Sequence, residues 1–309
     1  MSWPILLLIL AAPFLANRFA PVWSANLLVR LQRWKSGLAD KEVTLPGGVK
    51  MVYSEGGTGE PLILLHGLGA GRSSFETVAG LLTKEHHLII PDLPGFGESG
   101  QAADGNYKIF AQAERFGQFV EALGLESFHL GGNSMGGWIA AAYASQHPEK
   151  VKSLWLLAAA GTEDLLETEA VHARREQGSY ILLARNPKEF DGVLRRLFYR
   201  EPFIPFCVRW AAARQAAAYF PLHSKIFDQL LDHPYENQLE PHLPKITAPA
   251  LLAWGEQDQI VPLAVMRTFR RLLPNAQVSV LEDIGHVPQI EAPRRVAEDY
   301  KRFRLALSH

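Results

Sequence analysis

A serine flanked by glycines stands in the run Gly132-Asn133-Ser134-Met135-Gly136. The apolar residues Phe128 to Gly131 before it predict a strand, and the pattern from Gly136 to Gln146 predicts a helix. A G-x-S-x-G between a strand and a helix is typical of a tight turn that exposes a serine hydroxyl beside a helix N-terminus. We therefore take Ser134 as the candidate nucleophile. The alternative is a chance match, against which the strand-turn-helix context argues.

A serine hydroxyl needs a base to become a good nucleophile, and the base needs an acid to orient it. Asp258 and His286 follow Ser134 in the chain, each in a loop after a predicted strand. Such loops lie at the carboxyl ends of strands, where open α/β sheets build their sites. We predict that His286 is the base and Asp258 the orienting acid, with Glu256 and Asp283 as competing acids.

Acyl transfer places negative charge on a carbonyl oxygen, and two backbone N–H groups should meet it. The glycine-rich loop from His66 to Gly71 follows a predicted strand, and its backbone can approach a substrate closely. We predict that the N–H groups of Leu68 and Met135 form this oxyanion hole. A plain glycine-rich turn is the alternative; a phosphate loop is excluded because no G-K-[ST] follows.

Together these motifs resemble the α/β-hydrolase superfamily. The resemblance spans about residues 43 to 307 and is carried by His66-Gly67, the run Asp92 to Ser99, Gly132 to Gly137, Gly255 to Pro262, and Gly285-His286. It implies an α/β-hydrolase fold, with a mostly parallel eight-stranded sheet, helices on both faces and a helical cap inserted after the sixth strand. It implies a serine ester hydrolase that requires neither a metal nor an organic cofactor.

The elements that would position these residues alternate from residue 43 onward, as expected for a mostly parallel sheet covered by helices. The predicted strands are Val43 to Leu45, Val49 to Ser54, Leu62 to Leu65, Leu88 to Pro91, Phe128 to Gly131, Val151 to Ala158, Ala250 to Trp254 and Gln277 to Leu281. The predicted helices are Phe75 to Leu82, Phe110 to Leu123, Gly136 to Gln146, Leu263 to Leu272 and Pro293 to Leu307.

The alternation stops between residues 162 and 244, where the pattern is helical and rich in alanine, arginine and aromatic residues. This stretch is far longer than a connecting loop, so we interpret it as an inserted cap. The chain then divides into membrane and juxtamembrane helices (1–38), a first core part (39–161), the cap (162–244) and a second core part (245–309).

The N-terminus carries a different signal. Residues 1 to 17 contain no charged side chain and are almost wholly apolar from Trp3 to Ala16. As a helix they would reach about 26 Å, close to a bilayer core of about 30 Å. We predict an uncleaved single-pass anchor. A cleaved signal peptide fits less well, because no basic residue precedes the run and Phe14 stands where a small residue is needed; a buried helix of a soluble protein is the remaining alternative.

A second, amphipathic stretch follows at residues 23 to 38. Its apolar residues recur at spacings of three and four, and three polar residues fall on the other side: Trp23, Leu27, Leu31, Trp34 and Leu38 against Asn26, Arg30 and Arg33. The stripe predicts a helix that ends near Gly37 and lies in a membrane interface or packs on the body of the protein. We expect residues 1–38 to lie outside the hydrolase core.

Composition narrows the class of protein. Lys plus Arg number 31 and Asp plus Glu 32, so no basic excess is present to bind nucleic acid. The single cysteine, Cys207, cannot form a disulfide within the chain or build a cysteine-based zinc cluster. The family resemblance implies a lipid or fatty-acyl ester substrate, the apolar N-terminus predicts the bilayer as a partner, and the N-terminal helices are a candidate homodimer surface.

We predict a membrane-anchored serine carboxylic-ester hydrolase: an esterase or lipase, with phospholipase A or lysophospholipase activity included. The anchor and aromatic cap resemble membrane-bound bacterial lipases and phospholipases A, which implies the inner membrane with the catalytic domain in the periplasm. The basic residues Arg18, Arg30, Arg33 and Lys35 would instead place that domain in the cytoplasm.

Two alternatives remain. A carbon–carbon bond hydrolase of aromatic ring-fission products would use the same triad. Its dianionic substrate would need cationic partners, for which the cap offers Arg185, Arg195, Arg196 and Arg209. A non-catalytic hydrolase-like receptor or scaffold is the other alternative, against which the complete triad argues.

Overall fold

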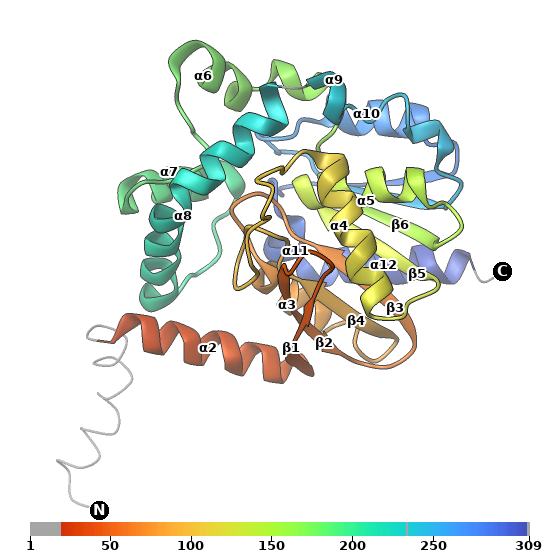
Figure 1. The fold of residues 1–309 in the computed structure, drawn as a ribbon, viewed down its shortest axis with the longest axis horizontal. Helices are drawn as coiled ribbons and strands as arrows, with labels where there is room; N and C mark the ends of the chain where they lie inside the picture. Colours follow the sequence, from red (N-terminus) through yellow and green to blue (C-terminus); the bar gives the residue numbers. More distant parts are fainter. Residues whose placement is uncertain (1–19, 233, 308–309) are drawn as a thin grey trace, which may run out of the picture.

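One eight-stranded sheet forms the centre of the molecule (Figure 1). The computed structural model describes residues 20–232 and 234–307. The strands lie in the order β1-β2-β4-β3-β5-β6-β7-β8. Their bounds are β1 Leu38–Thr44, β2 Lys50–Gly56, β3 Glu60–Leu65, β4 His86–Pro91, β5 Phe128–Asn133, β6 Val151–Leu157, β7 Ala250–Gly255 and β8 Ala276–Leu281. The β1–β2 and β2–β4 pairs are antiparallel, and the others are parallel.

Each of the eight predicted strands corresponds to a strand of this sheet, and the largest difference is in β1. We predicted its start at Val43, whereas it begins at Leu38 and pairs from there with β2, starting at Gly56. Residues 39–42 of β1 are exposed, and three of them are charged. Backbone pairing at the edge of the sheet, which leaves no apolar pattern in the sequence, holds this part of β1.

Helices cover both faces of the sheet, and the side chains of β3 show why. Ile63 and Leu65 belong to the core cluster beneath α4, α5 and α10, whereas Leu62 and Leu64 belong to the cluster beneath α3 and α12. A strand buried on both faces reads as a continuous apolar run. The helices are α3 Glu76–Ala79, α4 Ile109–Ala122, α5 Met135–Gln146, α10 Leu263–Leu272, α11 Pro288–Glu291 and α12 Pro293–Ala306, and a 3-10 turn, η1 Arg72–Phe75, precedes α3.

The chain between β6 and β7 is helical, and its described residues contain no strand. It comprises η2 Glu163–Glu167, α6 Glu169–Gln177, α7 Pro187–Leu197, α8 Phe206–Asp232, α9 Pro234–Asn237 and η3 Leu243–Lys245. Helix α8 contains Pro221 and bends along its length in Figure 1. Proline removes a helical hydrogen bond and clashes with the preceding turn, which accounts for the bend.

The N-terminal helix α2, Pro21–Lys35, packs against α8, β1 and α3. Gly37 follows it with φ +70°, as expected for a residue that ends a helix. Trp23, Leu27, Leu31 and Trp34 are exposed, so the interpretation that this stripe packs on the body of the protein is wrong for these four residues. Arg33, which we placed on the polar side of the helix, is buried.

The expectation that residues 1–38 lie outside the hydrolase core is wrong for α2 and the residues that follow it. The Arg33 guanidinium donates to Glu76 at 2.7 Å and to Asp40 at 2.6 Å, and the Ser36 hydroxyl donates to the Glu76 carbonyl at 2.8 Å. Leu38 is buried in the core cluster below α3. Polar contacts, rather than the apolar stripe, therefore attach α2 to the core.

The predicted anchor, residues 1–17, lies outside the described residues. Among residues 20–232 and 234–307, no helix combines the length and apolar character that a membrane crossing requires.

Candidate active site

Ser134 occupies the turn between β5 and α5. Its backbone has φ 55° and ψ −121°, a region that costs a non-glycine residue on the order of 1–3 kcal/mol. Its neighbours are glycines for steric reasons: a Cβ on Gly132 would lie 2.4 Å from the Gly136 backbone, and one on Gly136 would lie 2.1 Å from the Leu65 carbonyl. This close packing holds the strained turn and places Ser134 at the carboxyl ends of the central strands.

The structure brings His286 and Asp258 together. His286 Nδ1 lies 2.9 Å from Asp258 Oδ2, and both side chains are almost wholly buried. The other Asp258 oxygen accepts the backbone N–H groups of Ile260 and Val261 at 2.8 and 3.0 Å, which fixes the carboxylate. The Nδ1 atom then donates to the carboxylate, which leaves Nε2 as the acceptor.

The two competing acids have other partners. Asp283 pairs with Arg200 at 2.7 Å, and Glu256 accepts a bond from the Gln257 amide at 2.9 Å. Of the three acids that the sequence offered, Asp258 is thus the one that contacts His286.

Ser134 and His286 line the same cavity, of about 670 Å³, although no hydrogen bond joins their side chains. Catalytic hydrogen bonds are often long in structures without substrate and shorten when it binds.

Asn133 links the Ser134 turn to the loop that carries His286, because its amide donates to the backbone carbonyls of Leu157 at 2.9 Å and His286 at 3.1 Å. Our sequence reasoning missed this role, since the second position of G-x-S-x-G reads as variable.

The loop predicted to hold the oxyanion lies against Ser134. A Cβ on Gly67 would lie 3.2 Å from the Ser134 Cβ, so only glycine allows this approach without displacement. Among the described residues, neither the Leu68 N–H nor the Met135 N–H donates a hydrogen bond. Two N–H groups beside a serine hydroxyl can stabilise a developing oxyanion.

His66 holds this loop in place. Its Nε2 accepts the Leu93 N–H at 3.0 Å, so the ring hydrogen is on Nδ1, which donates to the Gly67 carbonyl at 2.8 Å. Burial lowers the pKa of His66 and keeps it neutral. The imidazole therefore acts as a fixed hydrogen-bonding spacer beside the loop.

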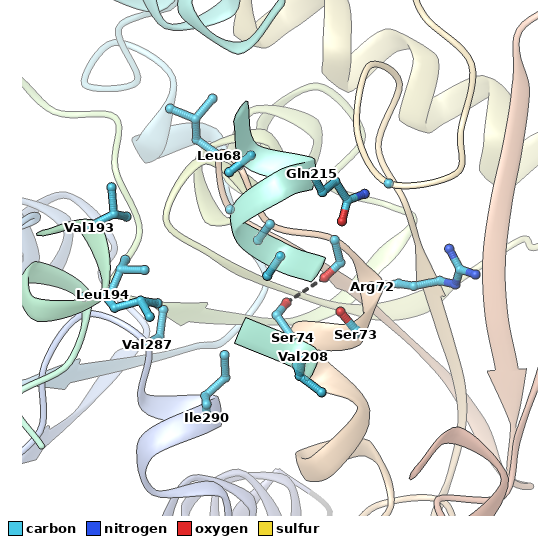
Figure 2. A pocket seen from close by; sticks show the side chains of 18 of the residues that line it. Leu68, Arg72, Ser73, Ser74, Val193, Leu194, Val208, Gln215, Val287 and Ile290 are labelled. Atoms are coloured by element: carbon cyan, nitrogen blue, oxygen red, sulfur yellow. Dashed lines mark hydrogen bonds between the residues drawn. The ribbon is translucent and has the colours of Figure 1, made fainter. Parts of the chain in front are cut away.

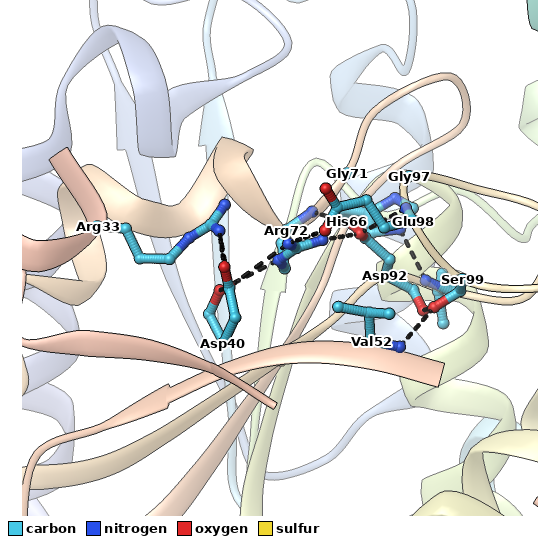
Figure 3. A network of polar contacts seen from close by, with 12 residues as sticks. Arg33, Asp40, Val52, His66, Gly71, Arg72, Asp92, Gly97, Glu98 and Ser99 are labelled. Carbon is cyan, nitrogen blue, oxygen red and sulfur yellow. Dashed lines mark hydrogen bonds and ion pairs between the residues drawn. The ribbon is translucent and has the colours of Figure 1, made fainter. Parts of the chain in front are cut away.

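A polar network, buried at Arg72 and Asp92 but exposed at Glu98 and Asp40, extends from the same loop to α2 (Figure 3). Asp92 accepts the Arg72 N–H at 2.7 Å and pairs with the Arg72 guanidinium, which also pairs with Glu98 and Asp40. Asp40 in turn pairs with Arg33 of α2. Consecutive ion pairs thus connect the N-terminal helix to the residue that follows Gly71 in the oxyanion loop.

The cavity has an apolar wall and a polar side (Figure 2). The wall combines cap residues Val193, Leu194 and Val208 with Leu68, Val287 and Ile290 of the core. The polar side carries Arg72, Ser73, Ser74 and Gln215. A cavity of this size and lining can hold an acyl chain next to Ser134.

Of the four cap arginines considered for a dianionic substrate, only Arg209 lines this cavity. Its guanidinium already pairs with Asp191 and Glu201. The described part of the cavity therefore lacks the free cap cation that a ring-fission dienoate would need. No group of three or more His, Cys, Asp or Glu side chains is placed to bind a metal within residues 20–232 and 234–307.

Gln289 is a second residue that the sequence did not single out. It lies on α11, lines the cavity and is buried, yet neither its amide nitrogen nor its amide oxygen has a hydrogen-bond partner. A buried amide without a partner costs about 1–3 kcal/mol. No sequence pattern marks such a residue, because its isolation depends on the neighbours that the fold supplies.

Known proteins resemble this chain in sequence and in fold. The family model of the alpha/beta hydrolase fold matches residues 60–293. A protein named Lipase 1 from Psychrobacter immobilis is 37% identical and covers 91% of the chain and 88% of its own length. A human monoacylglycerol lipase is 29% identical over 77% of the chain and 73% of its own length. The crystal structure of a membrane phospholipase A is 35% identical, covers 98% of this chain and 97% of its own, and superposes with a TM-score of 0.89.

Proposed function

The chain belongs to the α/β-hydrolase family, and from this premise we propose that it releases fatty acid from lipid-like carboxylic esters through an acyl-enzyme. As its relatives are lipases, it is a hydrolase of the lipase and esterase type. The observation that carries the finer proposal is the placement of Ser134 and the His286–Asp258 pair on one largely apolar cavity.

In the first half-reaction, the Ser134 oxygen attacks the acyl carbon while His286 Nε2 takes its proton. Asp258 holds the imidazole through Nδ1 and stabilises the charged ring. The Leu68 and Met135 N–H groups stabilise the negative oxygen of the tetrahedral intermediate. The C–O bond to the alcohol then breaks, and His286 gives its proton to the leaving oxygen. Water repeats the steps and releases the fatty acid and Ser134.

The lining of the cavity favours an ester over a ring-fission dienoate. The Val193, Leu194, Val287 and Ile290 side chains suit an acyl chain. Among the four cap arginines considered, only Arg209 lines the cavity, and two carboxylates pair with it. The carbon–carbon bond hydrolase is therefore the weaker candidate.

We propose further that residues 1–17 anchor the enzyme in a bacterial inner membrane, with the catalytic domain in the periplasm. Their apolar character supports the anchor, and the similarity to a membrane phospholipase A supports membrane association. Fractionation of the full-length protein tests it, since recovery in the soluble fraction without detergent would contradict an anchor.

The nucleophile is tested by Ser134→Ala, with Ser73→Ala as the control on the polar side of the same cavity. Loss of a triad serine typically lowers turnover by several orders of magnitude. We expect this loss for Ser134→Ala only, measured on medium-chain nitrophenyl esters, monoacylglycerols, lysophospholipids and diacyl phospholipids. More than about a tenth of wild-type activity in Ser134→Ala, or faster turnover of a dienoate than of any ester, would overturn the proposal.

A further inference from the structure

The cavity opens beside α2. The best-exposed residues of its lining include Asn26 and Arg30 of α2 and Gln215 of α8, whereas Asn133 and His286 at the inner end are buried. Helix α2 packs against α8, and the first turns of α8 stand next to α2 in Figure 1. A substrate that reaches Ser134 through this mouth therefore passes α2.

Large apolar side chains are exposed on α2 and on the cap near this mouth, although the α2 residues that line the cavity, Asn26, Val29, Arg30 and Arg33, lie on another face of the helix. On α2, Trp23 is 61% exposed and Trp34 is 74% exposed, and Leu27 and Leu31 lie between them at spacings that place all four on one face. On the cap, Phe203 is 92% exposed, and its two neighbours Pro202 and Ile204 line the cavity. We call these five residues, Trp23, Leu27, Leu31, Trp34 and Phe203, the apolar rim.

The segment that carries Phe203 is fixed to the site. Residues 198–205, which we call the strap, join α7 to α8. Just before the strap, the Leu197 carbonyl accepts the His286 N–H at 2.8 Å. At its start, the Tyr199 and Arg200 N–H groups donate to Glu291 at 3.2 and 2.9 Å. The strap therefore holds Phe203 in a defined position relative to His286.

We propose that the apolar rim enters the acyl boundary of a lipid bilayer, which places the mouth of the cavity at the lipid surface. Exposed Trp and Phe side chains are typical of surfaces that insert at this depth. Residues 1–17, which are uncharged, precede α2 in the sequence, and we expect them to lie in the membrane. The N-terminal end of α2 would then lie close to the bilayer. The evidence for membrane insertion is the exposure of the rim residues. Its functional role, delivery of lipid to Ser134, rests on the proposed lipid hydrolysis.

The charges around the rim fit an anionic lipid surface. Helix α2 contains no acidic residue, and its exposed Arg30 and Lys35 form no ion pair within the described part of the chain. On the strap, Arg200 pairs with Asp283 and Glu201 pairs with Arg209, so the strap presents no unpaired carboxylate. Basic residues near anionic head groups strengthen binding to such a surface.

A second copy of the chain is the competing occupant. Two copies of α2 would bring Arg30 and Lys35 of each helix near those of the other, with no acidic residue on either helix to neutralise them. The absence of a complementary charge on α2 favours the lipid surface over self-association.

The test places a reporter on the rim of the full-length protein in vesicles of phosphatidylglycerol and phosphatidylethanolamine. Phe203→Cys and Leu305→Cys each receive a polarity-sensitive fluorophore; Leu305 is 63% exposed on α12, far from α2 in Figure 1. The unsubstituted protein controls for Cys207, which is buried. We expect the label at 203 to shift to shorter wavelength and to be quenched by lipid-attached spin labels, and the label at 305 to be quenched by aqueous iodide.

Equal iodide quenching at both positions would overturn the proposal. Energy transfer between labels at 203 on different molecules, without lipid quenching, would overturn it in favour of a second copy. As a functional arm, Phe203→Ser should lower hydrolysis of vesicle lipid by about tenfold or more, because serine removes the apolar ring from the lipid. Hydrolysis of a soluble short ester by this variant, and of vesicle lipid by Leu305→Ser, should stay within about twofold of the wild-type rate. If the protein hydrolysed no ester, the proposed function would be refuted. The fluorescence result would still show whether the apolar rim enters the bilayer.

Discussion

Replacing Arg33 by methionine removes the side chain that attaches α2 to the core. Arg33 is 8% exposed and Glu76 is 2% exposed, and the two are joined at 2.7 Å. Glu76 would then remain buried without its cation. Asp40 would lose less, because it is half exposed and keeps contacts with Arg72 and Ser54.

Loss of one partner of a buried ion pair costs about 3–5 kcal/mol. We take the lower end, about 3 kcal/mol, because only Glu76 is left without a partner. For a chain of this size such a loss lowers the Tm by about 5 °C. The control is Arg30→Met on the same helix, where the arginine is exposed and forms no ion pair with a described residue; its unfolding free energy should change by less than about 0.5 kcal/mol.

Two further measurements distinguish loss of the Arg33–Glu76 ion pair from a general destabilisation of the fold. Arg33→Met with Glu76→Met should recover at least half of the lost stability, since both charges are then absent. Burial already raises the pKa of Glu76, and without Arg33 the pKa rises further. The folded state then binds the proton more tightly than the unfolded chain, so the deficit is largest near pH 7 and shrinks as the pH falls toward 4.5.

The assay is urea unfolding followed by circular dichroism between pH 4.5 and 8 in mild detergent. A loss below about 1 kcal/mol, no recovery in the double variant, or a deficit independent of pH would refute the assignment of α2 to the folded core.

Asp258→Asn should lower kcat by about a thousandfold or more, because an amide cannot hold His286 in the reactive tautomer; steady-state kinetics with an unchanged Tm would check it. Burial lowers the pKa of His129 to about 4, against about 6.5 in the unfolded chain. The unfolded state binds more protons in this window, so stability should fall by about 2–3 kcal/mol from pH 6.5 to 4. His129→Asn should weaken this dependence in urea unfolding at each pH; equal slopes would contradict it. Gln289→Met should raise the Tm by removing the unpartnered amide; a lower Tm would show that the amide has a stabilising partner.

The strands of the sheet and the order of the candidate residues could be read from the sequence. A strand buried on both faces must be apolar throughout, as in Leu62 to Leu65, and a tight strand-to-helix turn must have small residues around Ser134. Both constraints are local, so they leave a pattern in consecutive residues. The sequence could only rank Asp258 above other acids as the partner of His286. The contact itself depends on the sheet, which brings the two loops together.

The placement of α2 needed the tertiary structure. Periodicity shows that Trp23, Leu27, Leu31 and Trp34 share one face of a helix. It does not show whether other parts of the protein cover that face. The partners of Arg33 are Glu76 of α3, 43 residues along the chain, and Asp40 of β1, which is only seven residues away but lies beyond the end of α2, so helical spacing connects neither of them to Arg33. Which face of an amphipathic helix is buried depends on the surface it meets. Here that surface presents the carboxylates of Asp40 and Glu76, so the arginine is buried and the tryptophans remain outside.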